Sequence, residues 1–320
     1  MPPMLFLLMA LAAIPTAFHA HAAGTGPTEQ LVLILDWFVN PNHAPLIVAQ
    51  QRGFFQQEGV AVTLVPPTDP NLPSKLVAAG KANLAIAYQP QLHLQVVEGL
   101  AIARIATLID TPLSSLLVRA DGPVRTLSDL KGRRIGYSIS GYEDTLLRSM
   151  LGSGGISLHD VTLLNVHFAL LQPLVSGQVD AVIGAFRNFE VNQMKLEGHP
   201  VRAFYPEESG VPPYDELIVV AHRDRLNDPR LPRFVAALER AVLTLLNDPE
   251  RAWGDFITYQ KDLDTELNRR AWADTLHRFA HNPGVLDPVR YTRFSDFLRT
   301  NGMISEMPPL SRYAVSLGGR

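Results

Sequence analysis

The chain has 320 residues, 47% of them hydrophobic and 18% charged, which is typical of a globular protein with two domains or one large α/β unit. Its formal net charge is −3 at pH 7 and no run of Lys or Arg stands out, so a nucleic-acid-binding surface is not indicated. Cysteine is absent, which excludes a thiol nucleophile, a thiolate metal site and a lipid-modified cysteine anchor.

The first segment predicts export. Residues 4–18 are apolar and are followed by Ala20 and Ala22, small residues with the spacing of a signal-peptide cleavage site. The apolar stretch is too short to span a bilayer comfortably, although no Lys or Arg precedes it, and an anchor or a buried N-terminal helix is the alternative. We expect residues 1–22 to be a cleaved signal peptide, and the mature protein to be periplasmic and not lipid-anchored.

Short apolar runs alternate with helical segments from residue 30 onwards. The pattern predicts strands over 31–35, 60–65, 84–88 and 101–110, with helices over 43–57 and 74–79. Such alternation is typical of parallel βαβ units.

A second α/β set follows a strand predicted at 115–119. Its predicted elements are a capped turn at 126–132, strands at 134–137, 161–165 and 181–184, and helices from 143 and around 169–176. A strand at 217–221 precedes a largely helical tail with a long helix over 232–247.

Two α/β sets in tandem predict two lobes joined by a two-strand hinge, which can close around a ligand. We assign residues 23–118 and 222–320 to lobe one and residues 119–221 to lobe two. One continuous doubly wound sheet is the alternative.

Candidate site residues are the polar and aromatic side chains that follow each strand, because ligands of open α/β sheets bind beyond the carboxyl ends of the strands. The first cluster contains Asp36, Trp37, Asn42 and His43. It suits a planar heteroaromatic ligand, since rings stack on aromatic faces while carboxylates and amides bind the ring edge. Asn42 has an alternative role as a helix cap, and Trp37 as a core residue.

Four further pairs occupy comparable positions. They are Tyr88 and Gln89, Ser140 and Tyr142, Asn188 and Glu190, and Tyr214 and Glu216. Their alternative roles are rim packing for Tyr88, the start of a helix for Ser140 and Glu190, and a Pro-rich turn at Tyr214. The turn at 138–141 lacks the P-loop Lys and the GxGxxG spacing, so nucleotide binding of those kinds is not predicted.

Catalytic patterns are missing from the sequence: there is no GxSxG, no HExxH and no metal-ligand spacing. We therefore predict no catalytic residue, no metal and no cofactor.

Two motifs carry a family resemblance. The first is Asp36-Trp37-Phe38-x-Asn40-x-Asn42-His43 with the later Gly53-Phe54-Phe55, and the second is the segment at 126–136. Together they resemble the thiamine-pyrimidine branch of periplasmic binding proteins. That branch includes the formylaminopyrimidine-binding component of an ABC importer and the eukaryotic thiamine-pyrimidine synthase. The resemblance covers roughly residues 30–245.

The resemblance implies a type-2 periplasmic binding protein fold and a formylaminopyrimidine or hydroxymethylpyrimidine ligand in the cleft. It implies that Trp37 and Tyr88 stack on the ring, that Asn42 and His43 belong to the site, and that Glu190 pairs with the amino group of the pyrimidine. The expected partner is an ABC permease in the inner membrane, and the expected state is a monomer.

The sequence departs from the family pattern at several positions. Val39 replaces a usual Pro, Pro45 a usual Gly, and Phe186-Arg187 stands where a Trp is common. The synthase carries a cysteine-rich iron site, and this chain has no cysteine, so an enzyme is not expected.

A second ligand class stays open for the same fold: a sulfonate, taurine, nitrate or riboflavin-like molecule. An oxyanion needs a cation in the cleft, and Arg187 is the candidate, assisted by Ser138 and Ser140. Arg187 facing the cleft with Glu190 facing away favours this alternative. A receptor-coupled sensor module is a further one.

Overall fold

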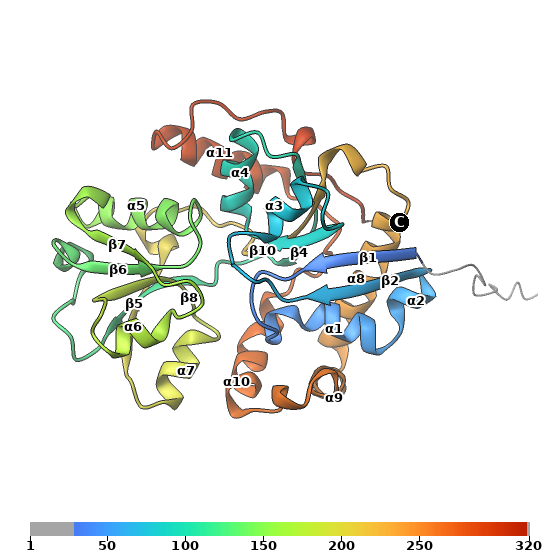
Figure 1. The fold of residues 1–320 in the computed structure, drawn as a ribbon, viewed down its shortest axis with the longest axis horizontal. Coiled ribbons are helices and arrows are strands. Elements are labelled where there is room, and N and C mark those ends of the chain that lie inside the picture. Colours follow the sequence, from blue (N-terminus) through green and yellow to red (C-terminus); the bar gives the residue numbers. More distant parts are fainter. Residues whose placement is uncertain (1–28, 319–320) are drawn as a thin grey trace, which may run out of the picture.

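Two α/β lobes make up the protein, and each is built on a five-stranded sheet (Figure 1). The computed structural model describes residues 29–318, so the predicted signal peptide lies outside the described residues. The first sheet, in the order β2-β1-β3-β10-β4, consists of β1 (Glu29–Ile34), β2 (Val60–Val65), β3 (Leu84–Ala87), β4 (Ile102–Ile109) and β10 (Leu217–His222). The second, in the order β7-β6-β8-β5-β9, consists of β5 (Ser114–Arg119), β6 (Arg134–Tyr137), β7 (Thr162–Asn165), β8 (Ala181–Phe186) and β9 (Val201–Phe204). The two-lobed α/β architecture predicted from the sequence is confirmed.

The lobe boundaries need a correction at both crossings. We placed them after residues 118 and 221, but β5 pairs with β8 and β9 in lobe two, and β10 pairs with β3 and β4 in lobe one. The chain therefore crosses at 110–113 and returns at 205–216. Both boundaries were one strand late, because the apolar pattern of a strand does not reveal which sheet it joins.

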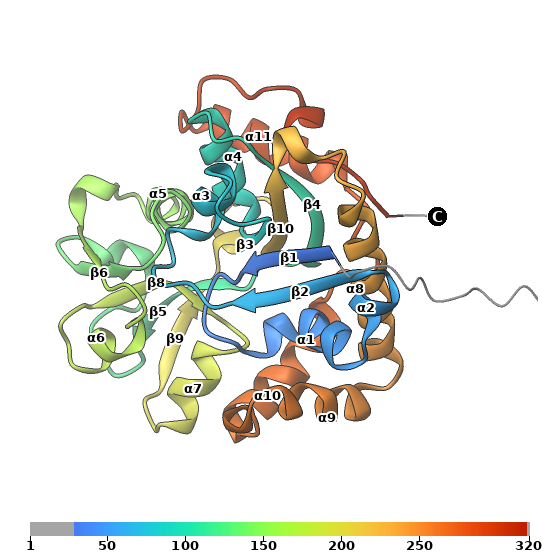
Figure 2. The ribbon, with the colours of Figure 1, turned by 45° about the vertical axis from the view of Figure 1, so that its right-hand side comes forward.

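The strand that enters each sheet from the other lobe runs antiparallel to its neighbours. β10 is antiparallel to β3 and β4, and β5 is antiparallel to β8 and β9. The remaining pairs are parallel, as predicted for βαβ units. The carboxyl ends of the parallel strands in both sheets thus point towards the space between the lobes (Figure 2).

Helices cover both faces of each sheet (Figure 1). Lobe one carries α1 (Ala44–Gln51), α2 (Phe54–Gln57), α8 (Arg230–Asn247), α9 (Pro249–Tyr259) and α10 (Glu266–Thr275) on one side, and α3 (Pro73–Ala78), α4 (Gln89–Val97) and α11 (Pro288–Thr300) on the other. Lobe two carries α5 (Glu143–Ser153) on one side, and α6 (Leu171–Val175) and α7 (Glu190–Leu196) on the other. None of the helices within residues 29–318 is long and apolar enough to cross a bilayer.

Local sequence explains where the helices begin and end. The helix predicted over 43–57 is split, because Gly53 adopts a left-handed conformation with φ of 68° between α1 and α2. In α8, buried residues recur every three or four positions, so one face packs against α1 and α9. This packing makes the largest core of lobe one, and the loop between β1 and α1, which contributes to the site, packs against α10.

Candidate ligand-binding site

A cavity lies between the two lobes and encloses about 400 Å³ of empty space, part of it open to solvent. We call it the inner cavity. Its lining residues are Asp36, Trp37, Asn40, Asn42, Tyr88, Ile139, Tyr142, Glu143, Leu170, Gly184, Phe186, Phe189 and Glu190. Within the inner cavity, the space that the centre of a water-sized sphere can occupy is about 20 Å³, room for roughly one water molecule, so the lobes are closed here more tightly than they would be around a ring ligand.

Strand ends bring these residues together. Asp36 follows β1, Tyr88 follows β3, and Glu143 begins α5 after β6. Phe186 is the last residue of β8, and Glu190 is the first residue of α7. Parallel strands place their carboxyl ends at one edge, so side chains far apart in the sequence converge on one cavity.

Aromatic rings from both lobes meet at the inner cavity. Tyr88 of lobe one stacks on Tyr142 of lobe two, with ring centroids 4.4 Å apart and planes 2° apart. Phe186 meets the edge of Tyr88 at 6.5 Å. Near the opening, Trp37 of lobe one packs on Phe168 of lobe two at 4.8 Å. The cavity walls are therefore flat and aromatic.

Asp36 holds the lobe-one wall in position. Its Oδ2 accepts a hydrogen bond from the Tyr88 hydroxyl at 2.9 Å, and its Oδ1 is 2.8 Å from His43 Nε2. The other ring nitrogen of His43 accepts the Asn40 N–H at 3.3 Å, so Nε2 carries the proton that is donated to Asp36. Burial and the Asp36 charge hold the pKa of Tyr88 well above its usual value, which keeps the hydroxyl a donor. Both Asp36 oxygens are thus committed to the protein itself.

Two further carboxyl groups, Glu143 and Glu190, border the inner cavity and keep free acceptor capacity. Glu190 Oε2 accepts the Phe186 N–H at 2.7 Å, and Glu143 Oε2 accepts the Ser138 N–H at 2.6 Å. Burial raises the pKa of Glu143 to about 8 and that of Glu190 to about 7. Near neutral pH the protonated and the ionised form of each carboxyl group are therefore both populated. The protonated form can donate a hydrogen bond to a ligand, and the ionised form can only accept hydrogen bonds, through both of its oxygens.

Glycine is required where Glu143 packs against β8. Gly184 has a φ of 91°, and a Cβ atom at this position would lie 2.1 Å from Glu143 Oε1. The absence of a side chain therefore makes room for the carboxyl group at the cavity wall.

Hydrogen bonds join the lobes on both sides of the cavity. Asn188 Nδ2 of lobe two donates to Asn42 Oδ1 at 2.7 Å and to Thr275 Oγ1 at 2.7 Å. On the opposite side, Asn71 Nδ2 of lobe one donates to the Ser138 carbonyl at 3.0 Å. Asn71 Oδ1 accepts the Ser140 N–H at 2.9 Å. The lobes are therefore in contact around the cavity, in a closed arrangement.

Glu216 ties the two crossings together at the hinge. It is fully buried, and its Oε2 accepts the N–H groups of Leu113 and Ser114 from the other crossing. Its Oε1 accepts the Tyr142 hydroxyl, which connects the hinge to the aromatic wall. Tyr214 is also fully buried, with its ring edge-on to Phe294 at 5.7 Å.

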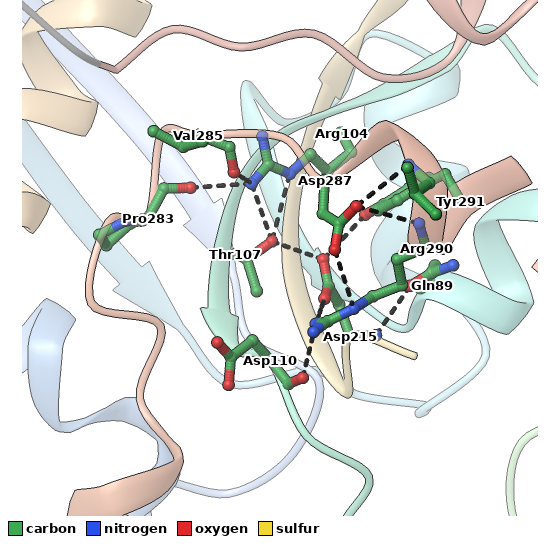
Figure 3. Close-up of polar contacts among 11 residues, drawn as sticks. Gln89, Arg104, Thr107, Asp110, Asp215, Pro283, Val285, Asp287, Arg290 and Tyr291 are labelled. Atoms are coloured by element: carbon green, nitrogen blue, oxygen red, sulfur yellow. Dashed lines mark hydrogen bonds and ion pairs between the residues drawn. The ribbon is translucent and has the colours of Figure 1, made fainter. Parts of the chain in front are cut away.

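A second polar cluster lies beside the return crossing, on the lobe-one side (Figure 3). Gln89 Oε1 accepts the Asp215 N–H at 2.7 Å, and Asp215 is ion-paired with Arg290. Thr107 donates to Asp215 Oδ2 at 2.8 Å, and the fully buried Arg104 donates to Thr107 at 2.9 Å. Gln89 therefore anchors the hinge segment.

Arg187 points away from the inner cavity. Its guanidinium group makes two parallel bonds to Glu207, at 2.6 and 3.0 Å, and lies 4.1 Å above the Tyr205 ring. It also donates to the carbonyl groups of Leu113 and Ser114 at 3.3 Å. Its charge is thus neutralised at the hinge, and it is not among the lining residues.

Six of the twelve predicted site residues line the inner cavity: Asp36, Trp37, Asn42, Tyr88, Tyr142 and Glu190. The other six lie outside the lining: His43, Gln89, Ser140, Asn188, Tyr214 and Glu216. Of these six, Ser140 is exposed, and the rest are buried in the contacts described above. In this structure these six stand around the lining residues, and their direct contact with a ligand stays a prediction.

Seven lining residues were not among the predicted site residues: Asn40, Ile139, Glu143, Leu170, Gly184, Phe186 and Phe189. Glu143 directly follows the turn between a strand and a helix, and this position in the sequence could have indicated a side chain at the cavity. Phe189 stands between two residues that were selected. No group of three or more His, Asp or Glu suited to a metal ion occurs within residues 29–318.

Two α/β lobes, two crossings and a cavity between them define a two-lobed protein with the periplasmic binding protein fold. The alkanesulfonate-binding protein SsuA from Xanthomonas axonopodis pv. citri is similar, with a TM-score of 0.69 and 19% identity over 89% of this chain and 96% of that chain. A Candida albicans protein with the generic periplasmic binding protein fold has a TM-score of 0.71 and 16% identity over 91% and 96% of the two chains.

The chain belongs to the family described as NMT1/THI5 like, whose model matches residues 40–252. A Haemophilus influenzae protein named for thiamine biosynthesis is 48% identical over 90% of this chain and 92% of its own. The formylaminopyrimidine-binding protein of Halalkalibacterium halodurans is 30% identical over 84% and 82%. A 4-amino-5-hydroxymethyl-2-methylpyrimidine phosphate synthase of Schizosaccharomyces pombe is 21% identical over 87% and 83%. The predicted family resemblance is confirmed.

Proposed function

We propose that the protein is the periplasmic solute-binding component of an ABC importer and captures a thiamine-precursor aminopyrimidine, such as formylaminopyrimidine or hydroxymethylpyrimidine. The observation that carries the proposal is the inner cavity, which combines carboxyl groups with flat aromatic walls and has no Lys or Arg among its lining residues. The relatedness to a formylaminopyrimidine-binding protein supports the same ligand class.

The chemistry of the lining suits an aminopyrimidine ring. An exocyclic amino group donates two hydrogen bonds, and the free oxygens of Glu143 and Glu190 accept such bonds. The ring nitrogens are acceptors, and the Asn42 amide group or a protonated carboxyl group is a matching donor. Trp37 and Phe189 offer apolar faces for the ring.

An oxyanion ligand is a poorer match to this cavity. A sulfonate or nitrate needs a cation or free N–H donors, but Arg187 is bound to Glu207, and the Ser138 and Ser140 N–H groups are bound to Glu143 and Asn71. A bound anion would also raise the pKa values of Glu143 and Glu190 further and lie near Asp36, so no positive charge in the lining offsets its own. This alternative is therefore not the one we propose.

Binding rather than catalysis is proposed for this chain. Hydrogen bonds between the lobes on both sides of the cavity suit a mechanism in which closure buries the ligand, and the closed form then docks on a permease as a monomer. The synthase alternative predicts product formation or bound iron, either of which would be detected directly with the purified protein.

A thermal-shift screen of the mature protein tests the proposal. Ligands that bind only the folded state stabilise it by about 2.7 kcal/mol at a concentration of about 100 times Kd. We expect a rise in Tm with 4-amino-5-hydroxymethyl-2-methylpyrimidine and with formylaminopyrimidine, and none with taurine, alkanesulfonates or nitrate. Glu190→Gln and Trp37→Ala should reduce the rise, whereas Glu98→Gln, at an exposed glutamate directly after α4, should not. A rise only with sulfonates or nitrate would overturn the ligand assignment.

A further inference from the structure

A second hollow opens directly from the inner cavity. We call it the outer compartment; it is open to solvent, has a volume of about 360 Å³, and is bordered by Phe38, Phe168, Leu171, Val175 and Glu197, among others. It shares five lining residues with the inner cavity: Trp37, Asn40, Leu170, Phe189 and Glu190. The two spaces are therefore neighbours, and a substituent on a ring held against these shared residues would lie beside the outer compartment.

Glu190 stands between the two spaces. It is nine-tenths buried and borders both of them, and within residues 29–318 its side chain makes one hydrogen bond, through Oε2 to the Phe186 N–H. Its second oxygen is thus available to a ligand at the junction. A buried carboxyl oxygen without a protein partner favours a ligand that brings a donor or a positive charge.

The outer compartment has the character of a site for a cation. Phe38 is 54% exposed, a large exposure for a Phe side chain, and it packs at 4.9 Å against Phe168 from the other lobe. Aromatic faces attract cations, and Glu197 at the rim adds a negative charge. No Lys or Arg is among the lining residues of either space.

We infer that the outer compartment binds an uncharged or cationic substituent carried by the ring ligand, up to the size of a second, positively charged heteroaromatic ring, and that it disfavours a phosphate ester at the same position. This inference rests on the proposed function, because it takes an aminopyrimidine in the inner cavity as its starting point. It extends the ligand class from single-ring pyrimidines to aminopyrimidines with a cationic extension.

Isothermal titration of the full mature protein with four probes tests the inference. The probes are 4-amino-5-hydroxymethyl-2-methylpyrimidine, its phosphate ester, its 5-aminomethyl analogue, which is a cation at neutral pH, and thiamine, which carries a thiazolium ring. We expect the aminomethyl analogue and thiamine to bind at least tenfold more tightly than the phosphate ester.

Two variants locate the effect. Glu197→Gln should lower the affinity for the two cationic probes relative to the hydroxymethyl compound by about two- to fivefold, as for an exposed charge pair. Phe38→Ala should lower the affinity for the cationic probes, relative to the hydroxymethyl compound, by a similar factor. The reason is that the attraction between a cation and an exposed aromatic ring has about the same free energy as an exposed charge pair. Glu98→Gln is the matched control, since Glu98 and Glu197 are both exposed and both follow the last residue of a helix.

The outcomes separate the two ideas. If the hydroxymethyl compound does not bind, the proposed function is wrong and the inference falls with it. If that compound binds but the phosphate ester binds as tightly as the cationic probes, the inference alone is wrong. Cationic probes whose relative affinity is unchanged in both Glu197→Gln and Phe38→Ala would likewise refute it.

Discussion

Replacing Glu143 by Gln tests whether one buried carboxyl group controls the pH dependence of stability. Glu143 is 1% exposed, and burial raises its pKa from 4.5 to about 8. Because the pKa in the folded state is above the unfolded value, the folded protein holds the proton more tightly than the unfolded chain does. The resulting stabilisation is fully present below about pH 4.5 and is lost as the pH rises to about 8.

The magnitude follows from the shift. One pKa unit corresponds to about 1.4 kcal/mol, so the wild-type protein should lose about 2 kcal/mol of stability between pH 6 and pH 8 through Glu143. Gln does not ionise, and its side-chain oxygen still accepts the Ser138 N–H. Glu190 titrates in both proteins, so its contribution cancels in the comparison.

Urea denaturation of both proteins at the two pH values is the assay. We expect the free energy of unfolding of Glu143→Gln minus that of wild type to be about 2 kcal/mol larger at pH 8 than at pH 6, so that the variant gains stability relative to wild type as the pH rises. Glu98→Gln should show no such change. An equal difference between Glu143→Gln and wild type at both pH values would refute the raised pKa and the reasoning from burial.

Two further substitutions test the cavity wall and the contact between the lobes. Gly184→Ala puts a Cβ atom 2.1 Å from Glu143 Oε1, so we expect about 1–3 kcal/mol of destabilisation in urea denaturation and weaker pyrimidine binding in titration. Unchanged stability would contradict the close packing of Glu143 against β8. Asn188→Ala removes the hydrogen bonds to Asn42 and Thr275, so we expect about 1–3 kcal/mol of destabilisation and a larger radius of gyration in small-angle X-ray scattering. A variant as compact and as stable as wild type would show that Asn188 does not hold the lobes together.

Most elements were predictable because hydrophobic periodicity reports burial directly. The elements missed have physical reasons. β9 is a four-residue edge strand whose residues are all half-buried, so its apolar pattern is weak. The helix α4 was not predicted, although Pro90 stands near its N-terminus, where proline is common.

The candidate site was only half predictable. Asp36, Tyr88 and Glu190 were found because topology alone places strand ends at the cavity. His43 and Glu216 stand at equivalent positions in the sequence, yet they lie behind the cavity wall, where they bind the lining residues Asp36 and Tyr142. Which side chains keep a free oxygen depends on partners far away in the chain, and one sequence does not reveal those partners.

The carboxyl group of Glu216 also determines where motion between the lobes can be observed. Because it holds Leu113 and Ser114 from the opposite crossing, we expect the lobes to rotate about an axis close to it. Displacement grows with distance from that axis, as along a lever. A pair of spin labels or fluorophores at Asn71 and Ser140, which face each other across the closed edge, would therefore report opening with high sensitivity. A pair placed beside Glu216 would keep a constant separation and act as the internal reference.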